Sequence, residues 1–215
     1  MGQYYFPVSI EKKQHVYSHD IKYTYKRDDG QTFEMGNGLK LMEHSYVRND
    51  FVNAVATLIA IGGAWHGDRI VWAGDYADPE KSEKTGRPLK RNLYDIVGDD
   101  KIIPAIPKKI YRYFLNLDTK EFVDVTKCPE EDPNQLGWNI HPLPLLTCEG
   151  NGRGGGDFHG EHPMIGKWAR NRIEASYTKP KGATEIFPNF TERNEVYFAP
   201  KKVKKAKTKA KAVVS

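Results

Sequence analysis

Cysteines, long apolar runs and targeting signals are scarce or missing in this sequence. Only two cysteines occur among its 215 residues, Cys128 and Cys148, and neither belongs to a C-x-x-C pair. We therefore expect two buried thiols in a reducing compartment, rather than disulfides or a zinc site. No apolar stretch approaches the ~20 residues of a membrane span, no secretory signal is recognisable, and Phe6 stands where a myristoylation signal needs Ser or Thr. These absences favour a cytoplasmic protein that has no membrane partner.

Acidic residues are absent from the last fifteen positions, and this absence accounts for the positive charge of the chain. The net charge is +5, but residues 201–215 contain seven lysines, which leaves 26 basic against 28 acidic residues in the remainder. Such a dense run of like charges predicts a disordered tail that binds DNA or RNA by counterion release, without sequence preference. A solubility tail with no partner is the alternative. The predicted nucleic-acid contacts are Lys201, Lys202, Lys204, Lys205, Lys207, Lys209 and Lys211.

The chain ahead of the tail has the composition of a folded body. Hydrophobic residues make up 39% of the chain and aromatic residues 12%, which favours a β-rich or mixed fold over disorder. Two stretches share the pattern G-x-W-x-x-[DN]-R-I, namely GAWHGDRI at 63–70 and GKWARNRI at 166–173. The match aligns Trp65 with Trp168 and indicates an internal repeat.

A second match lies upstream in nearly the same register. GLKLMEHS (38–45) and HPLPLLTC (141–148) both read L-x-L followed by Met or Leu, 24 and 23 residues ahead of their tryptophans. Further upstream, each copy has an apolar run broken by a charged turn, which in the second copy predicts a hairpin turning at residues 118–120. We therefore expect an α+β fold with two related β-rich units, 1–78 and 110–178, packed about a pseudo-two-fold axis. Two independent small domains are the alternative.

The two units are expected to differ in the middle. In the first unit, Asn49 is a helix cap, apolar residues then follow one helical face, and Gly62 and Gly63 end the helix. The apolar residues are Phe51, Val52, Val55, Leu58 and Ile59. The second unit places a glycine-rich segment there, and because ordering glycine is entropically costly, replacing a helix in this way suggests a function. The stretches 79–109 and 127–139 are predicted surface loops, and the body is expected to span 1–200.

The glycine-rich segment matches G-x-G-x-x-G at 150–155. Gly160 and Pro163 prevent a helix from starting there, which excludes a Rossmann site, and no G-K-[ST] follows to make a P-loop. An anion-binding nest of backbone N–H groups remains, and a loop that only lets two backbones approach closely is the alternative. The predicted ligand contacts in this segment are Asn151, Gly152, Arg153, Gly154 and Asp157.

Acidic residues and a histidine of the first unit are further candidates. Glu43, His44 and Asp75 are predicted to lie across the same crevice, although Glu43 and His44 would face opposite sides of a strand. Asp75 and Asp78 have the G-D-x-x-D spacing of metallophosphoesterases, but the D-x-H that should precede them occurs only after them, at 157–159, and the G-N-H motif of that family is missing. A metal-dependent phosphoester hydrolase is therefore the alternative, and turn-forming aspartates with a structural histidine are the plainer interpretation. No metal or cofactor is expected.

The start MGQYY, together with GLKLMEHS, WAGDYAD and the glycine-rich segment, resembles a group of uncharacterised proteins of bacteria and their phages. The resemblance covers about residues 1–178 and does not include the lysine tail. It implies a phage or prophage setting and action in the cytoplasm of a bacterial host, and it transfers no catalytic residues.

Together these patterns favour a binding protein rather than an enzyme. The expected ligand is a nucleotide or another small anion near the glycine-rich segment, and the tail is expected to contact nucleic acid. A virion or host-takeover protein that binds a partner chain is a further alternative. The sequence does not determine the oligomeric state.

Overall fold

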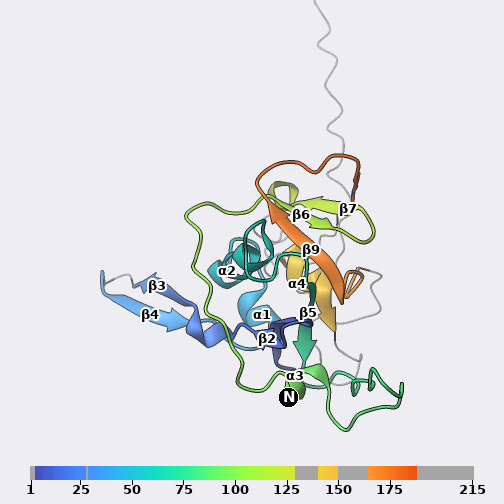
Figure 1. Ribbon diagram of the computed structural model, residues 1–215. Coiled ribbons are helices and arrows are strands. Elements are labelled where there is room, and N and C mark those ends of the chain that lie inside the picture. The colour runs from blue at the N-terminus through green and yellow to red at the C-terminus, as the bar shows by residue number, and fades with distance from the viewer. Residues whose placement is uncertain (1–2, 28, 129–139, 150–163, 188–215) are drawn as a thin grey trace, which may run out of the picture.

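The computed structural model describes residues 3–27, 29–128, 140–149 and 164–187, which form a mixed α+β protein built mainly around one sheet (Figure 1). The strands are β1 (Tyr5–Ser9), β2 (Gln14–His15), β3 (Lys22–Lys26), β4 (Thr32–Gly36), β5 (Arg69–Gly74), β6 (Tyr113–Asn116), β7 (Glu121–Asp124), β8 (Cys148–Glu149), β9 (Asn171–Ser176) and β10 (Thr184–Glu185). The helices are α1 (Leu41–His44), α2 (Asp50–Ile59), α3 (Leu93–Ile96) and α4 (Pro142–Thr147), with 3-10 turns η1 (Ser18–Asp20) and η2 (Val125–Lys127). No helix of the described ranges is long and apolar enough to span a membrane.

The main sheet has the strand order β10-β7-β6-β9-β5-β1-β2, with β8 added beside β5. β8 and β10 pair in parallel with their neighbours, and the other pairs are antiparallel. From the central β5–β9 pair outward, β5 is followed by the hairpin strands β1 and β2, and β9 by the hairpin strands β6 and β7, with β10 added beyond β7. The β3–β4 hairpin forms a separate two-stranded sheet that projects from the body (Figure 1).

One face of the sheet carries a core to which both halves of the chain contribute. Trp65, Trp72 and Trp168 are fully buried in it, and α2 contacts β9 while α4 contacts β5. Burying several large aromatic side chains in one place supplies much of the hydrophobic free energy of a domain of this size.

The other face of the sheet is covered over β1 and β5 by part of the connection between the halves. Phe6 and Val71 point to this face and pack with Leu93 and Val97, which belong to α3 and its end. Residues 79–109 were predicted to be a plain surface loop, and this expectation is wrong for α3. A helix of four residues is too short to show an apolar period in the sequence.

Two local predictions are confirmed. Asn49 caps α2, since its side chain accepts hydrogen bonds from the backbone N–H groups of Phe51 and Val52. The second hairpin turns at residues 118–120, where Lys120 adopts a left-handed φ of 58° between β6 and β7.

The hairpin turns of the two halves are held by corresponding hydrogen bonds. Arg69 donates its backbone N–H and Nε to Glu11, and Arg172 donates the same two groups to Asp118. Arg69 and Arg172 are themselves opposite each other in the β5–β9 ladder. The backbone N–H and Nε groups of each arginine therefore hold a hairpin turn on its own side of this pair.

The aligned tryptophans also make corresponding contacts. Trp65 donates from Nε1 to Gln14 Oε1 at 3.2 Å, and Trp168 donates to Glu121 Oε2 at 2.9 Å. Gln14 and Glu121 are the first residues of β2 and β7. Trp65 and Trp168 lie in turns just ahead of β5 and β9.

The middle segments bond to the backbones of the two tryptophans. The backbone N–H of Trp65 donates to Leu58 in α2, and that of Trp168 donates to Leu146 in α4. Each tryptophan thus bonds a leucine in a helix, in α2 in one case and in α4 in the other, and segment 38–45 makes no such bond to Trp65 among the backbone bonds of the described residues. Leu58 precedes Trp65 by seven residues and Leu146 precedes Trp168 by 22. The glycine-rich segment lies outside the described residues, so the expectation that it replaces a helix stays a prediction.

Candidate ligand-binding pocket

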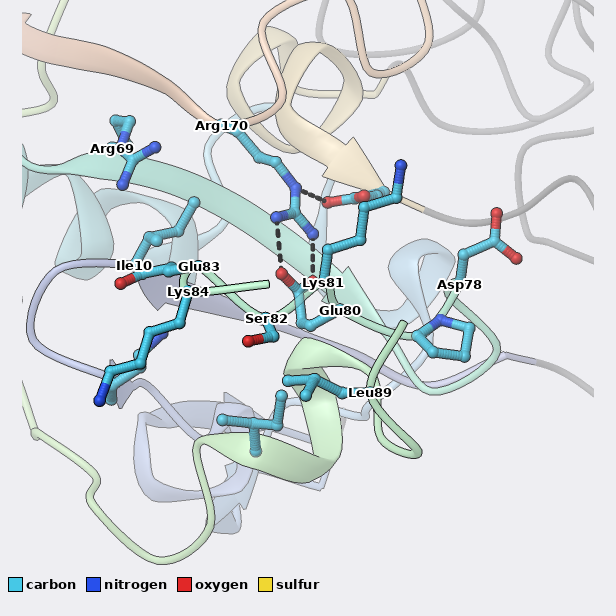
Figure 2. Close-up of a pocket in the computed structure, with 14 residues that line it drawn as sticks. Ile10, Arg69, Asp78, Glu80, Lys81, Ser82, Glu83, Lys84, Leu89 and Arg170 are labelled. Carbon is cyan, nitrogen blue, oxygen red and sulfur yellow. Dashed lines mark hydrogen bonds and ion pairs between the residues drawn. The ribbon is translucent and has the colours of Figure 1, made fainter. Parts of the chain in front are cut away.

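A pocket of about 760 Å³ lies between the sheet and the chain that follows β5 (Figure 2). Its apolar walls are Ile10, Pro79, Leu89 and Ile96. Its polar and charged lining comes from the first hairpin turn, from the start of β5, from residues 78–84, from the end of β8 and from the turn before β9. The pocket therefore brings together five segments of the chain.

Residues 80–91 form one wall of the pocket as a hairpin-like excursion. Glu80 donates its N–H to Arg91, Leu89 donates back to Glu80, and Lys81 and Pro88 form an isolated antiparallel bridge. The excursion closes at Gly86, whose φ of 66° is left-handed and suits glycine. These bonds hold the charged side chains of the wall in defined places.

Asn92 attaches this excursion to the end of β5. Its Nδ2 donates to the backbone oxygens of Asp75 at 2.8 Å and Ala77 at 3.2 Å, while its Oδ1 caps α3 by accepting from the N–H of Asp95. A single buried amide thus satisfies three backbone groups and sets the position of the wall relative to the sheet.

Arg170 joins the segments around the pocket. Its guanidinium reaches Glu149 Oε2 from Nε at 2.6 Å, and its two terminal nitrogens hold both oxygens of Glu80, as the dashed lines in Figure 2 show. These bonds lower the pKa of Glu80 and raise that of Arg170. Such a forked pair is stronger and more specific in geometry than a single ion pair.

The backbone of Arg170 is left-handed, with a φ of 64°. This conformation costs a residue other than glycine about 1 kcal/mol. The corresponding position of the first half is Gly67, whose φ of 83° carries no such cost. The backbone N–H of Arg170 donates to Ile70 at 2.8 Å, which fixes the turn. The second half therefore holds a strained arginine where the first half has an ordinary turn glycine.

The pocket is lined by five cations and four acids, namely Lys13, Arg69, Lys81, Lys84 and Arg170 against Asp78, Glu80, Glu83 and Glu149. Lys13, Lys81 and Lys84 line it, are exposed, and make no ion pair with any residue of the described ranges. Glu80 and Glu149 are both bound to Arg170. Three ammonium groups beside an apolar wall can hold a small anion that also carries an apolar or aromatic part.

His44 lies in the core, away from this pocket. It is fully buried, its Nδ1 bonds the backbone oxygen of Gly38 at 2.9 Å, and its Nε2 accepts from Trp72 Nε1 at 3.1 Å. Burial lowers its pKa to about 4. Both ring nitrogens are used within the protein, so His44 has none left for a ligand.

The other predicted contacts of the first unit are not brought together either. Glu43 lies beside His44 on α1 rather than on a strand, and its Oε2 accepts from the N–H of Lys40. Asp75 accepts from the N–H of Tyr4 at 3.1 Å, and burial raises its pKa. Only Asp78, named for the hydrolase alternative, lines the pocket. Within the described part of the chain, no three Asp, Glu, His or Cys side chains form a metal-binding group.

Several predicted contacts lie outside the described residues. These are Asn151, Gly152, Arg153, Gly154, Asp157 and the seven tail lysines from Lys201 to Lys211. Glu149, which lines the pocket, is bonded directly to Gly150, where the glycine-rich segment begins.

Sequence reasoning missed Arg170, Glu80 and the lysines of the pocket. One signal was present, because the aligned motifs GAWHGDRI and GKWARNRI differ at Gly67 and Arg170. Comparisons with protein-family models, with curated proteins and with solved structures gave no match.

Proposed function

We propose that this protein binds a small phosphorylated ligand, such as a nucleotide, in the pocket beside Arg170, and that it does so without catalysis. The observation that carries the proposal is a lining of five cations against four acids, in which Lys13, Lys81 and Lys84 make no ion pair within the described residues, next to the apolar wall of Leu89 and Ile96. Ammonium groups pair with phosphate oxygens, and the apolar wall suits a base or another flat group.

The glycine-rich segment is proposed as a second part of this site. Its support is the direct bond between Glu149 and Gly150, and the many N–H groups that a glycine-rich chain can present to an anion. The phage-type setting and cytoplasmic location rest on the resemblance of the sequence motifs.

The lysine tail is proposed to contact DNA or RNA. Its support is the charge of residues 201–215, which hold seven lysines and no acid. This part of the function does not depend on the pocket.

We further propose that the two halves arose by duplication of one unit and pack about a pseudo-two-fold axis. Support comes from the strand order, from the opposed Arg69 and Arg172, and from the matching tryptophan and hairpin bonds. In this view the pocket results from divergence, since Arg170 stands where the other unit keeps Gly67.

The hydrolase alternative has no observation in its favour among the described residues. Asp75 and Asp78 are followed by a chain that turns into the 80–91 excursion, and neither belongs to a group of three potential metal ligands. Asp75 is instead bonded to the backbone of Tyr4.

Isothermal titration of the full chain with inorganic phosphate, AMP and ATP tests the binding function. We expect a nucleotide to bind, and Lys81→Ala combined with Lys84→Ala to weaken it about tenfold, because each exposed ion pair contributes up to ~1 kcal/mol. Lys90→Ala is the matched control, since Lys90 is exposed on the same excursion and does not line the pocket. Absence of binding, or an equal loss with Lys90→Ala, would contradict the proposal.

A further inference from the structure

A second cationic surface lies at the opposite half of the sheet, where segments 108–112 and 176–181 run side by side. The backbone N–H of Arg112 donates to Ser176, and the hydroxyl of Tyr177 donates to the backbone oxygen of Lys109 at 2.9 Å. The two segments contain five cations and no acid. The cations are Lys108, Lys109, Arg112, Lys179 and Lys181, and all are exposed.

Two tyrosines are stacked at the centre of this surface. The rings of Tyr111 and Tyr177 have centroids 4.3 Å apart and an interplanar angle of 13°. Tyr177 is 41% exposed, and Lys109 Nζ lies 5.1 Å from the centre of its ring. The stacking and the hydroxyl bond hold Tyr177 in one orientation. Tyr111 covers one face of its ring and the ammonium group of Lys109 lies over the ring as well, so a base would displace Lys109 to stack there.

The carboxylates near this surface leave part of its charge uncompensated. Asp124 is paired with Arg112, and Glu185 serves both Lys127 and Lys179. Lys108 and Lys181 form no ion pair within the described part of the chain. A polyanion is the partner that such an arrangement favours.

The described chain ends on the same surface. Ile186 donates its N–H to Phe122, and Lys127 Nζ lies 4.9 Å from the ring of Phe187, the last described residue. Lys201 follows only 14 residues later, which is a reach of at most about 50 Å. The tail lysines therefore start close enough to bind the same polyanion as the body.

We propose that this surface binds single-stranded nucleic acid, with a base stacked on Tyr177 and the backbone phosphates on Lys108, Lys109 and Lys181. Stacking requires an unpaired base, and an aromatic platform flanked by cations is the usual means of holding single strands without sequence preference. The inference deepens the nucleic-acid contact proposed for the tail, because it names the class of nucleic acid and adds a contact in the body.

Fluorescence anisotropy with the full chain tests this inference, using a labelled oligo-dT of about 15 nucleotides and a duplex of the same length. Tyr177→Ala is expected to weaken single-strand binding at least about fivefold, since stacking contributes ~1–3 kcal/mol per base, and to leave duplex binding unchanged. Tyr177→Phe keeps the ring and should bind as the wild type does. The double variant Lys108→Ala with Lys181→Ala should weaken the binding of both the single strand and the duplex, and should make the affinity depend less steeply on salt concentration.

Tyr76→Ala is the matched control, because Tyr76 is an exposed tyrosine (37%) away from this surface. A variant with the seven tail lysines changed to glutamine separates the two contacts. If Tyr177→Ala, with a wild-type melting temperature, binds the single strand as well as the wild type does, the body surface is overturned while the tail contact stands. If the variant without the seven tail lysines retains full binding while Tyr177→Ala loses it, the tail proposal fails and the surface proposal stands.

Discussion

At the scale of single residues, each half of the chain buries a polar side chain that has an atom without a hydrogen-bond partner among the described residues. His141 lies five residues before Leu146, and Asn53 lies five before Leu58, so both have the same spacing to the leucine that bonds a tryptophan. His141 Nδ1 accepts from the N–H of Leu143 and caps α4, while its Nε2 has no partner among the described residues. Asn53 Oδ1 is likewise buried without a hydrogen-bond partner among the described residues.

Burial lowers the pKa of His141 to about 3, well below the ordinary value of 6.5. Since the unfolded chain takes up this proton first, stability is fully present above pH 6.5 and is lost as the pH falls toward the folded pKa. His44 acts in the same sense, with a pKa of about 4. The loss of folding stability on acidification is therefore expected to begin at a higher pH than titration of the carboxylates alone would give.

His141→Asn tests this origin of acid sensitivity, because asparagine is a good helix cap and already caps α2 as Asn49. We expect the variant to fold and its free energy of unfolding to fall less steeply between pH 6.5 and about 5. The difference in slope should approach 1.4 kcal/mol per pH unit, the value for one proton. Urea unfolding at a series of pH values measures it, and identical slopes for the variant and the wild type would contradict the assignment.

At the scale of elements, the pocket wall depends on a short helix and its cap. α3 has four residues, so its stability must come from the packing of Leu93 on the sheet and from Asn92. The Oδ1 cap of Asn92 stabilises α3, whereas the two bonds from its Nδ2 hold the chain after β5. Their contributions to the free energy of unfolding can therefore be measured separately.

Asn92→Ala is expected to destabilise the protein by about 2 kcal/mol, because it removes the cap of α3 and leaves the carbonyls of Asp75 and Ala77 without their donor. Asn92→Asp keeps a capping oxygen but not the donor, and should lose only part of this free energy. Hydrogen exchange should show faster exchange over residues 79–97 in both variants. Equal exchange in Asn92→Ala and the wild type would mean that the wall does not depend on this residue.

The sequence predicted long or well-marked elements and missed short ones. α2 was predictable because it has ten residues, an asparagine cap and a clear apolar face. α4 was missed since its six residues contain Pro142 and Pro144, although proline is tolerated in the first turn of a helix. The repeat motif singled out two tryptophans that make similar hydrogen bonds, whereas the pairing of 38–45 with 141–148 depended on a few leucines and stays a prediction.

The site was less predictable than the fold. Glu80 and Glu149 lie 90 and 21 residues from Arg170 in sequence, and nothing local marks them as partners. His44 was singled out for its chemistry, yet its neighbour Trp72, 28 residues away, makes it a core residue. Pairings of this kind arise from strand order, which hydrophobic periodicity does not reveal.

At the scale of the whole molecule, the two halves share rather than divide their core. α2 of the first half packs on β9 of the second, and α4 of the second packs on β5 of the first. Trp65 and Trp168 lie in the same buried cluster. Because each half covers the other, neither can lose its structure without exposing the apolar side chains of its partner.

Because the helix of each half packs on a strand of the other, we predict that the body unfolds as one cooperative unit. Hydrogen exchange followed by mass spectrometry at increasing urea gives a free energy of opening for separate peptides. We expect the slowest amides of β5 and β9 to converge on the same value, equal to the free energy from the urea transition measured by tryptophan fluorescence. The β3–β4 hairpin serves as an internal control, since it projects from the body and should open at a lower free energy. If the amides of β9 instead opened at a lower free energy than those of β5, the halves would be separate folding units, and the shared tryptophan core would not couple them.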